Sequence, residues 1–232
     1  MENNLAQKIT AFATIIALPF ALGAFLLTWA PAQHFYQSDP TYDGFVQPRS
    51  ISKLVETTQD STVTVYCDYG VEKYKTTLLT NHHVIEKCLD NNKKIYVLAL
   101  VGKETEAVID RVDVVNDLAV LVTTLVVENL YLSNYKPNPG YWIAAVGSAD
   151  GYEGSVAFGN VLNMDKYELL ITAPLSSGSS GGPLIDNEGN VVGVNTKTPI
   201  GSDYQYNLAM SLDALCLKIM KCEDDVFWKV ED

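Results

Sequence analysis

The sequence predicts an all-β protein, a barrel or a sandwich, from two observations. Hydrophobic residues alternate along short stretches: Val63, Val65 and Cys67 share one face of 61–69, while threonine and tyrosine side chains occupy the other. Turn residues punctuate the stretches at short intervals and leave little room for helices. Further strands are expected at 75–80, 95–101, 107–115, 118–127, 141–146, 155–163, 169–173, 184–185 and 191–195, and one helix at 212–220.

Changes in composition divide the chain of 232 residues into segments. Beyond the first 50 residues about 180 remain, enough for one domain or for two small barrels that share an interface. Two prolines and a glycine in 134–140 mark a link inside this region. We therefore expect a short tail at 1–8, a membrane anchor or signal peptide at 9–32, a stalk at 33–50, a folded domain at 51–222 with units at 51–133 and 140–215, and an acidic tail at 223–232.

The N-terminal apolar stretch has two readings. No charged residue occurs from Ile9 to Ala32, and the run 11–30 would span ~30 Å as a helix, one bilayer core. Trp29 suits an interfacial anchor, whereas Ala30-Pro31-Ala32 has the small-x-small form of a signal-peptide cleavage site. The run is longer than a usual signal core, which favours an uncleaved anchor. Both readings place the folded domain outside the cytoplasm, secreted if the segment is cleaved.

The charge of the chain bears on its partners. The formal net charge is −12, from 28 acidic and 16 basic residues. An acidic surface repels phosphate backbones, so nucleic acid is not an expected partner. The sequence has no basic patch that would bind anionic lipids. The one expected membrane contact is therefore the N-terminal helix.

Residues 178–184 read Gly-Ser-Ser-Gly-Gly-Pro-Leu, a pattern typical of an acyl-transfer nucleophile. Ser180 would supply the hydroxyl, and the backbone N–H groups of Gly178 and Ser180 would form an oxyanion hole. Glycine allows the backbone dihedrals and the close approach of substrate that such a turn requires. The alternative is a glycine-rich hairpin loop without chemistry.

Two further motifs supply the partners of a serine nucleophile. Residues 80–84 read Thr-Asn-His-His-Val, and 116–121 read Asn-Asp-Leu-Ala-Val-Leu. A serine hydroxyl needs a base, and the base needs a carboxylate that fixes its tautomer. Asp117 opens an apolar run that reads as a buried strand, which favours it over Asp110 and Asp113. A metal site that joins the histidine pair to cysteines fits no common zinc spacing.

These three motifs resemble those of trypsin-like serine proteases of the HtrA/Deg branch. There the motifs are Thr-Asn-x-His-Val, Asp-Leu-Ala-Val-Leu and Gly-Asn-Ser-Gly-Gly-Pro-Leu, and the likeness covers roughly residues 52–215. By this pattern His83 is the base, whereas His82 is a neighbour and His34 lies outside the domain. The chain departs from the pattern at Ser179, where asparagine is usual; we expect this side chain to do no chemistry.

The resemblance implies a fold and an activity. It implies two six-stranded antiparallel β-barrels with a short C-terminal helix, and peptide-bond hydrolysis through His83, Asp117, Ser180 and an acyl-enzyme intermediate. Protein or peptide substrates, a periplasmic setting and no metal or organic cofactor follow from the same likeness, and a homo-oligomer is compatible with it. About ten residues follow Cys222, so no PDZ domain is expected after the protease domain.

The resemblance also suggests a specificity pocket and a disulfide. The pocket residues would be Thr172, Ala173, Pro174, Gly193, Val194 and Asn195. None of them is charged, which favours small or medium aliphatic substrate residues before the scissile bond. The chain has four cysteines, and a Cys67–Cys88 bond would bracket the histidine motif. Cys216 and Cys222 can pair only if a helix bends or ends between them; the alternative is four buried thiols.

Two rival functions stay open. A protease fold with its triad residues could be held inactive and serve as an anchored binding module. An α/β-hydrolase esterase would instead need Gly-x-Ser-x-Gly at a strand-to-helix turn and the order Ser, Asp, His. This chain has the order His, Asp, Ser in a β-rich context, which argues against the esterase.

Overall fold

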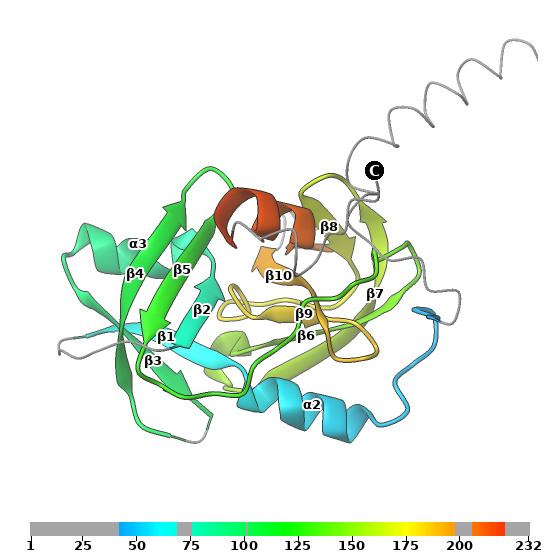
Figure 1. The fold of residues 1–232 in the computed structure, drawn as a ribbon, viewed down its shortest axis with the longest axis horizontal. Helices are drawn as coiled ribbons and strands as arrows, with labels where there is room; N and C mark the ends of the chain where they lie inside the picture. The colour runs from blue at the N-terminus through cyan, green and yellow to red at the C-terminus, as the bar shows by residue number, and fades with distance from the viewer. Residues whose placement is uncertain (1–41, 69–75, 101, 198–205, 221–232) are drawn as a thin grey trace, which may run out of the picture.

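The computed structural model describes residues 42–68, 76–100, 102–197 and 206–220, and within them two antiparallel β units lie side by side (Figure 1). The N-terminal unit contains β1 (Val63–Asp68), β2 (Thr76–Thr80), β3 (Lys94–Ala99), β4 (Thr105–Asp113) and β5 (Leu118–Thr123). The C-terminal unit contains β6 (Trp142–Gly147), β7 (Ser155–Met164), β8 (Glu168–Ile171), β9 (Pro183–Ile185), β10 (Val191–Lys197) and β11 (Asn207–Ser211).

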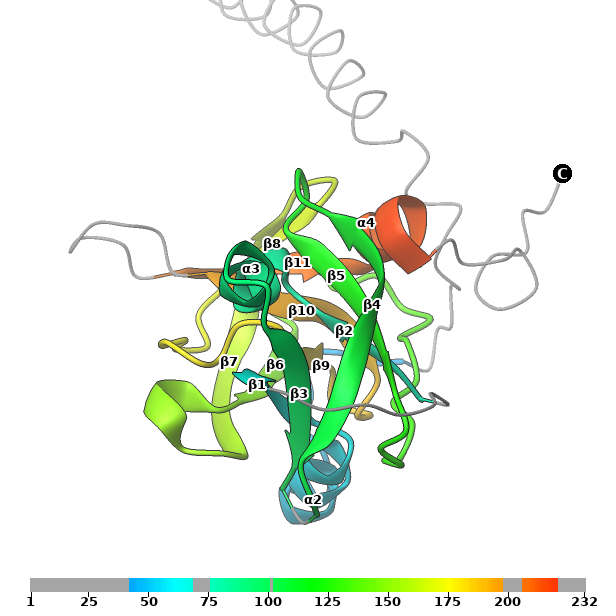
Figure 2. The same ribbon diagram turned by 90° about the vertical axis from the view of Figure 1, so that its left-hand side faces the viewer.

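The N-terminal unit is an open sheet rather than the closed six-stranded barrel that the resemblance implied. Its five strands run in the order β1-β3-β4-β5-β2, and Figure 2 shows this unit facing the viewer. β1 pairs with β3, and β2 pairs with β5, so these two strands form the edges of the sheet. Within the described residues no strand lies between these two edges, and the sheet does not close.

The C-terminal unit is a closed six-stranded barrel, in agreement with the expectation. Its strands run β10-β11-β8-β7-β6-β9, and β9 and β11 both pair with β10. Ile143, Leu169 and Leu184 are fully buried inside it together with Val192 and Ala209. Closure leaves this sheet without a free edge.

One hydrophobic cluster joins the two units. Leu118 and Val120 of β5 pack with Trp142 and Ile185 of the C-terminal barrel. The C-terminal helical segment, α4 (Leu212–Ala214) followed by the π-helical η3 (Leu215–Met220), covers this junction and contacts β4 and β5 (Figure 1). This segment matches the helix predicted at 212–220.

Two helices were not predicted. α2 (Ile51–Asp60) begins at Ser50, whose hydroxyl accepts the N–H of Lys53. Its Leu54 packs on the shared cluster, and the side-chain amide of Gln59 donates to the Gly154 carbonyl at 2.6 Å. α2 thus holds the start of the N-terminal unit against the C-terminal barrel.

The second helix that was not predicted, α3 (His82–Asp90), buries Ile85 and Cys88 under the N-terminal sheet. A short 3-10 turn, η2, covers Ala149–Gly151.

The chain before α2 also contacts the C-terminal barrel. The backbone N–H of Trp142 donates to the Gly44 carbonyl at 2.8 Å. The Tyr42 ring stacks on Tyr135 at a centroid distance of 3.9 Å, and Phe45 meets Tyr141 edge-on. Ordered contacts therefore begin before the domain boundary expected at residue 51. The predicted anchor at 9–32 lies outside the described residues, within which no helix is long and apolar enough to cross a membrane.

Candidate active site

His83 is placed by the junction of β2 and α3. Asn81 has an extended backbone before the helix, and its buried side-chain amide donates to the Asp117 carbonyl at 2.9 Å. His83 therefore lies in the first turn of α3, with 43% of its side chain exposed, while His82 beside it is half-buried. The local sequence thus holds the histidine backbone against the loop that carries the aspartate.

Asp117 lies in the turn between β4 and β5 and is held in a left-handed backbone conformation with φ of 52°. One carboxylate oxygen accepts the His83 backbone N–H at 2.9 Å, and the other lies 2.7 Å from His83 Nδ1. Partial burial raises the pKa of Asp117, but the hydrogen bonds from His83 and Thr196 outweigh it and hold the pKa below its ordinary value. Asp117 is thus the ionised partner of His83.

The competing aspartates have other roles. Asp113 accepts hydrogen bonds from the backbone and side chain of Asn116 and shapes the turn that carries Asp117. Asp110 pairs with the neighbouring Arg111 at 2.8 Å. The aspartate chosen from the sequence is therefore the one that contacts His83.

Ser180 lies in the loop between β8 and β9, and Thr196 connects it to the His83–Asp117 pair. The Ser180 hydroxyl donates to the Thr196 carbonyl at 2.6 Å. The Thr196 hydroxyl donates to Asp117 Oδ2 at 3.0 Å. His83 and Ser180 line the same cavity, although no hydrogen bond joins these two described side chains. Serine, threonine and aspartate thus form one chain of contacts across the two β units.

The loop around Gly178 leaves two backbone N–H groups available. The Ser177 carbonyl accepts the N–H of Asp150 at 2.6 Å, and the Gly178 carbonyl accepts that of Ser148 at 3.0 Å. In a planar trans peptide the N–H points opposite to the carbonyl, so Gly178 N–H is directed away from Asp150. Within the described residues neither Gly178 N–H nor Ser180 N–H has a backbone partner. This arrangement suits an oxyanion hole.

Glycine is required at position 178 by its surroundings. Its φ is 92°, and a Cβ atom there would lie 2.1 Å from the Ser148 carbonyl oxygen. Ser179, where asparagine was expected, is buried, and its hydroxyl accepts the N–H of Ser176 at 3.3 Å. Ser179 therefore closes the turn that precedes the nucleophile, and it is not among the residues that line the cavity shared by His83 and Ser180.

The residues proposed for the specificity pocket do not form one site. Ala173 is buried in the barrel core, and Asn195 is fully buried, where its amide donates to the Val146 and Pro183 carbonyls. Thr172 accepts the N–H of Asn160 through its hydroxyl, and Gly193 lies against the Met210 carbonyl. Pro174 borders a small cavity of about 260 Å³, and Val194 borders the large one beside Ser180.

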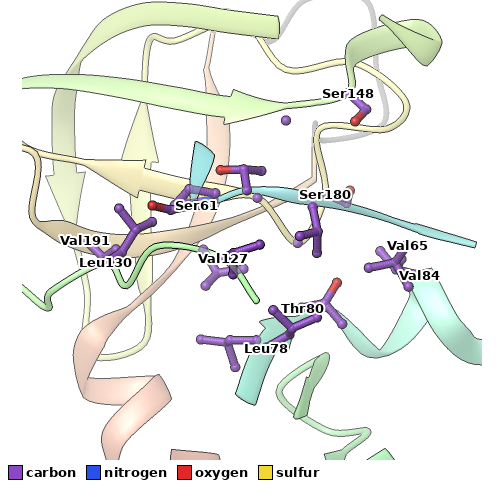
Figure 3. A pocket seen from close by; sticks show the side chains of 18 of the residues that line it. Ser61, Val65, Leu78, Thr80, Val84, Val127, Leu130, Ser148, Ser180 and Val191 are labelled. Carbon is purple, nitrogen blue, oxygen red and sulfur yellow. The ribbon is translucent and has the colours of Figure 1, made fainter. Parts of the chain in front are cut away.

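The large cavity, of about 920 Å³, extends from His83 and Ser180 between the two β units. We call it the inter-barrel cavity. In Figure 3 Ser180 lies near Val65 and Val84, while Leu130 and Val191 lie farther along it. Eleven of the side chains that line it are aliphatic, and they stand among serine, threonine and a few charged side chains. The aliphatic members are Val63, Val65, Leu78, Leu79, Val84, Val120, Val127, Leu130, Leu132, Val191 and Val194.

The cysteine predictions are tested only in part. Cys88 and Cys216 each form a disulfide bond, so these two are not the buried free thiols of the alternative. The side chains of Cys67 and Cys222 lie outside the described part of the chain, and the Cys67–Cys88 pairing stays a prediction. Within the described ranges no three metal-ligating side chains gather at one place.

Sequence reasoning missed Thr196, Asn81 and the turn at Ser148. Thr196 is 79 positions from Asp117, and Ser148 is 30 positions from Gly178, so neither contact has a local signature. Asn81 stood inside the histidine motif, which offered a signal, but its contact with Asp117 depends on the tertiary fold.

A closed barrel and a second β sheet that bring a histidine–aspartate pair and a serine to one cavity define the architecture of the trypsin-like fold. Residues 65–194, more than half of the chain, match the trypsin-like peptidase domain family. The chain therefore belongs to that family.

Curated relatives are named as periplasmic proteases. A "probable periplasmic serine endoprotease DegP-like" of Chlamydia muridarum is 30% identical over 154 residues, which cover 61% of this chain and 30% of the relative. A protein of the same name from Marinomonas sp. is 33% identical over 136 residues, which cover 52% of this chain and 27% of the relative. The chain thus spans less than a third of the length of these relatives.

Solved structures support the same fold. The serine endoprotease from Yersinia pestis superposes with a TM-score of 0.64 at 25% identity, over 76% of this chain and 67% of that one. Deg5 superposes with a TM-score of 0.58 at 24% identity, over 70% and 88% of the two chains, which is a likeness of fold alone.

Proposed function

We propose that this protein is a serine endopeptidase that hydrolyses peptide bonds through His83, Asp117 and Ser180. The observation that carries the proposal is the chain of contacts from Ser180 through Thr196 to the His83–Asp117 pair. Asp117 occupies His83 Nδ1, which leaves Nε2 to act on a proton. Acyl transfer needs this combination of nucleophile, base and oriented carboxylate.

In the proposed reaction the Ser180 side chain first rotates away from the Thr196 carbonyl toward His83 Nε2. His83 takes the hydroxyl proton as Ser180 Oγ attacks the carbonyl carbon of the scissile bond. The N–H groups of Gly178 and Ser180 stabilise the oxyanion. His83 then protonates the leaving amine, and water hydrolyses the acyl-enzyme by the same route in reverse order.

The same proposal covers location and partners. The relatives are named as periplasmic, and an apolar N-terminal stretch at 9–32 would hold the domain at the outer face of a membrane. Protein or peptide substrates and no metal or organic cofactor agree with this chemistry. Self-association into a homo-oligomer is part of the expectation by resemblance.

The proposal is tested by hydrolysis of an unfolded protein such as casein. Ser180→Ala should lower turnover by roughly a millionfold while leaving the fold intact, because the nucleophile is lost. Ser155→Ala is the matched control, since the Ser155 hydroxyl only donates to the Tyr152 carbonyl, and it should behave as the wild type. A folded wild-type protein without hydrolysis would favour the anchored binding module.

A further inference from the structure

The inter-barrel cavity exists where the N-terminal sheet fails to close. Within the described residues β1 pairs only with β3 and β2 only with β5, so one edge of each strand faces the gap. Val63 and Val65 of β1 and Leu78 of β2 line the cavity from these two edges. A volume of about 920 Å³ is at the upper end of the size of ligand-binding cavities.

The cavity is bordered by both reactive side chains, His83 and Ser180. In the proposed reaction, the leaving amine must approach the group that protonates it, which is His83. His83 and Val84 belong to the N-terminal unit, as do the open edges of the sheet. The part of a substrate that follows the scissile bond therefore lies toward the N-terminal sheet and the mouth of this cavity.

We propose that the inter-barrel cavity binds an apolar side chain of the substrate segment that follows the scissile bond, so that this protein selects substrates with a large aliphatic or aromatic residue there. The inference rests on the proposed function, since it needs His83 to act on the leaving amine. In an extended segment successive side chains point to opposite faces, so one of the first two residues after the bond points into the cavity.

The chemistry of the lining favours this occupant. Burial of one valine- or leucine-sized side chain among aliphatic groups is worth about 1.5–3 kcal/mol relative to water. Arg111 is the one lysine or arginine among the described residues that line the cavity, and its guanidinium is hydrogen-bonded to Asp110 and to the carbonyls of Ile219 and Met220. Glu128 and Asp150 also border the cavity, so an acidic substrate side chain would meet like charges there, and a small polar one would bury little apolar surface.

The test uses the full-length protein and two series of quenched fluorescent peptides, varied at the first or the second residue after the scissile bond. Leucine or phenylalanine should give a kcat/KM at least about tenfold above serine or aspartate at one of these positions. The preference is the ratio of two kcat/KM values measured with the same enzyme, so a change that affects all peptides equally cancels.

Val127→Trp should fill the cavity and remove the preference. Val126→Trp is the matched control, because Val126 is 84% exposed and next to it in sequence; this variant should keep the wild-type preference. If Val127→Trp does not fold, Leu130→Trp, from the same wall, decides the question. A folded cavity-filling variant that keeps the preference would overturn the inference.

Labelling of Ser180 by a small fluorophosphonate separates the two proposals, since the reagent carries no segment after the scissile bond. A wild-type protein that is labelled and cleaves all peptides of both series equally well retains the proposed function and refutes the cavity assignment. A folded wild-type protein that is neither labelled nor active refutes the proposed function, and the inference falls with it.

Discussion

The two β units differ in how far they are completed, and the reactive groups are divided between them accordingly. The C-terminal unit is a closed barrel that holds Ser180 and Gly178 in a loop braced by Ser148 and Asp150. The N-terminal unit is an open sheet that contributes His83 and Asp117 from the ends of its strands. The closed unit fixes the groups that need exact backbone geometry, whereas the open unit supplies side chains and leaves a cavity beside them.

Among the comparisons of the two units, the largest expected effect tests the contribution of the open sheet. Asp117→Asn should lower kcat/KM for peptide hydrolysis by roughly 10⁴, because an amide in this position would favour the wrong tautomer of His83. Asp110→Asn, an acidic residue of the same sheet bonded to Arg111, should stay near wild type. Equal effects of the two substitutions would show that the open sheet does not supply the carboxylate.

A second comparison concerns packing. Leu169→Ala, in the core of the closed barrel, should lower the free energy of unfolding by about 2–5 kcal/mol. Leu78→Ala should cost only about 1–2 kcal/mol, because one side of Leu78 already borders the inter-barrel cavity and has fewer contacts to lose. Urea unfolding curves of both variants measure the difference. A larger loss for Leu78→Ala would mean that the open sheet is the better-packed unit.

Thr196 bridges the two units, and its substitution probes how strongly they cooperate. Thr196→Val removes the hydrogen bond to ionised Asp117, worth about 1.5–3 kcal/mol, so kcat/KM should fall roughly tenfold to a hundredfold. Thr196→Ser keeps the hydroxyl and should restore most of the activity. Similar losses in both variants would assign Thr196 a packing role instead.

Two carboxylates allow the two units to be compared through the pH dependence of stability. Burial raises the pKa of Asp213, beside the closed barrel, to about 6, although Lys136 and Lys166 oppose it, and within the described residues its oxygens have no hydrogen-bond partner. The pKa of Asp117 in the open sheet is lowered instead. Between about pH 4 and 6 the folded chain therefore keeps the Asp213 proton while the unfolded chain releases it. The free energy of unfolding that Asp213 contributes is lost as pH rises through this range.

The expected size of the Asp213 effect is roughly 1–3 kcal/mol. Urea unfolding of wild type and Asp213→Asn at pH 4.5 and 7.5 measures it. Relative to wild type, the variant should gain stability at the higher pH. The Asp117 contribution has the opposite sign, since it is lost as pH falls through the lowered pKa. A wild-type-minus-variant difference for Asp213 that does not change with pH would contradict this assignment.

The features that could be predicted from the sequence are those whose signal lies within a short stretch of the chain. The motifs around His83, Asp117 and Ser180 are contiguous, and the structure brings the His83–Asp117 pair together. Most strands were placed within a few residues, because alternation and turn residues are local signals. α3 was missed since the histidine motif follows a strand, although Ile85 and Cys88 have helical spacing.

Features that depend on the whole fold were beyond the sequence. The closure of the N-terminal sheet was expected by resemblance, but among the described strands this sheet is open, since strand number is set by pairing between distant segments. The pocket residues were also taken from resemblance, and Ala173 and Asn195 turn out to be buried in structural roles. Thr196 has no local signal, because its hydroxyl meets Asp117 only after the two units have packed together.

The central claim is that Ser180 is an activated nucleophile, and the most direct test is to map the site of covalent labelling. The folded full-length protein is treated with a small fluorophosphonate, and the adduct is located by mass spectrometry, with His83→Ala treated in parallel. The account predicts a single adduct on Ser180 that His83→Ala does not form. A folded protein with no adduct, or with an adduct on another residue, would contradict it.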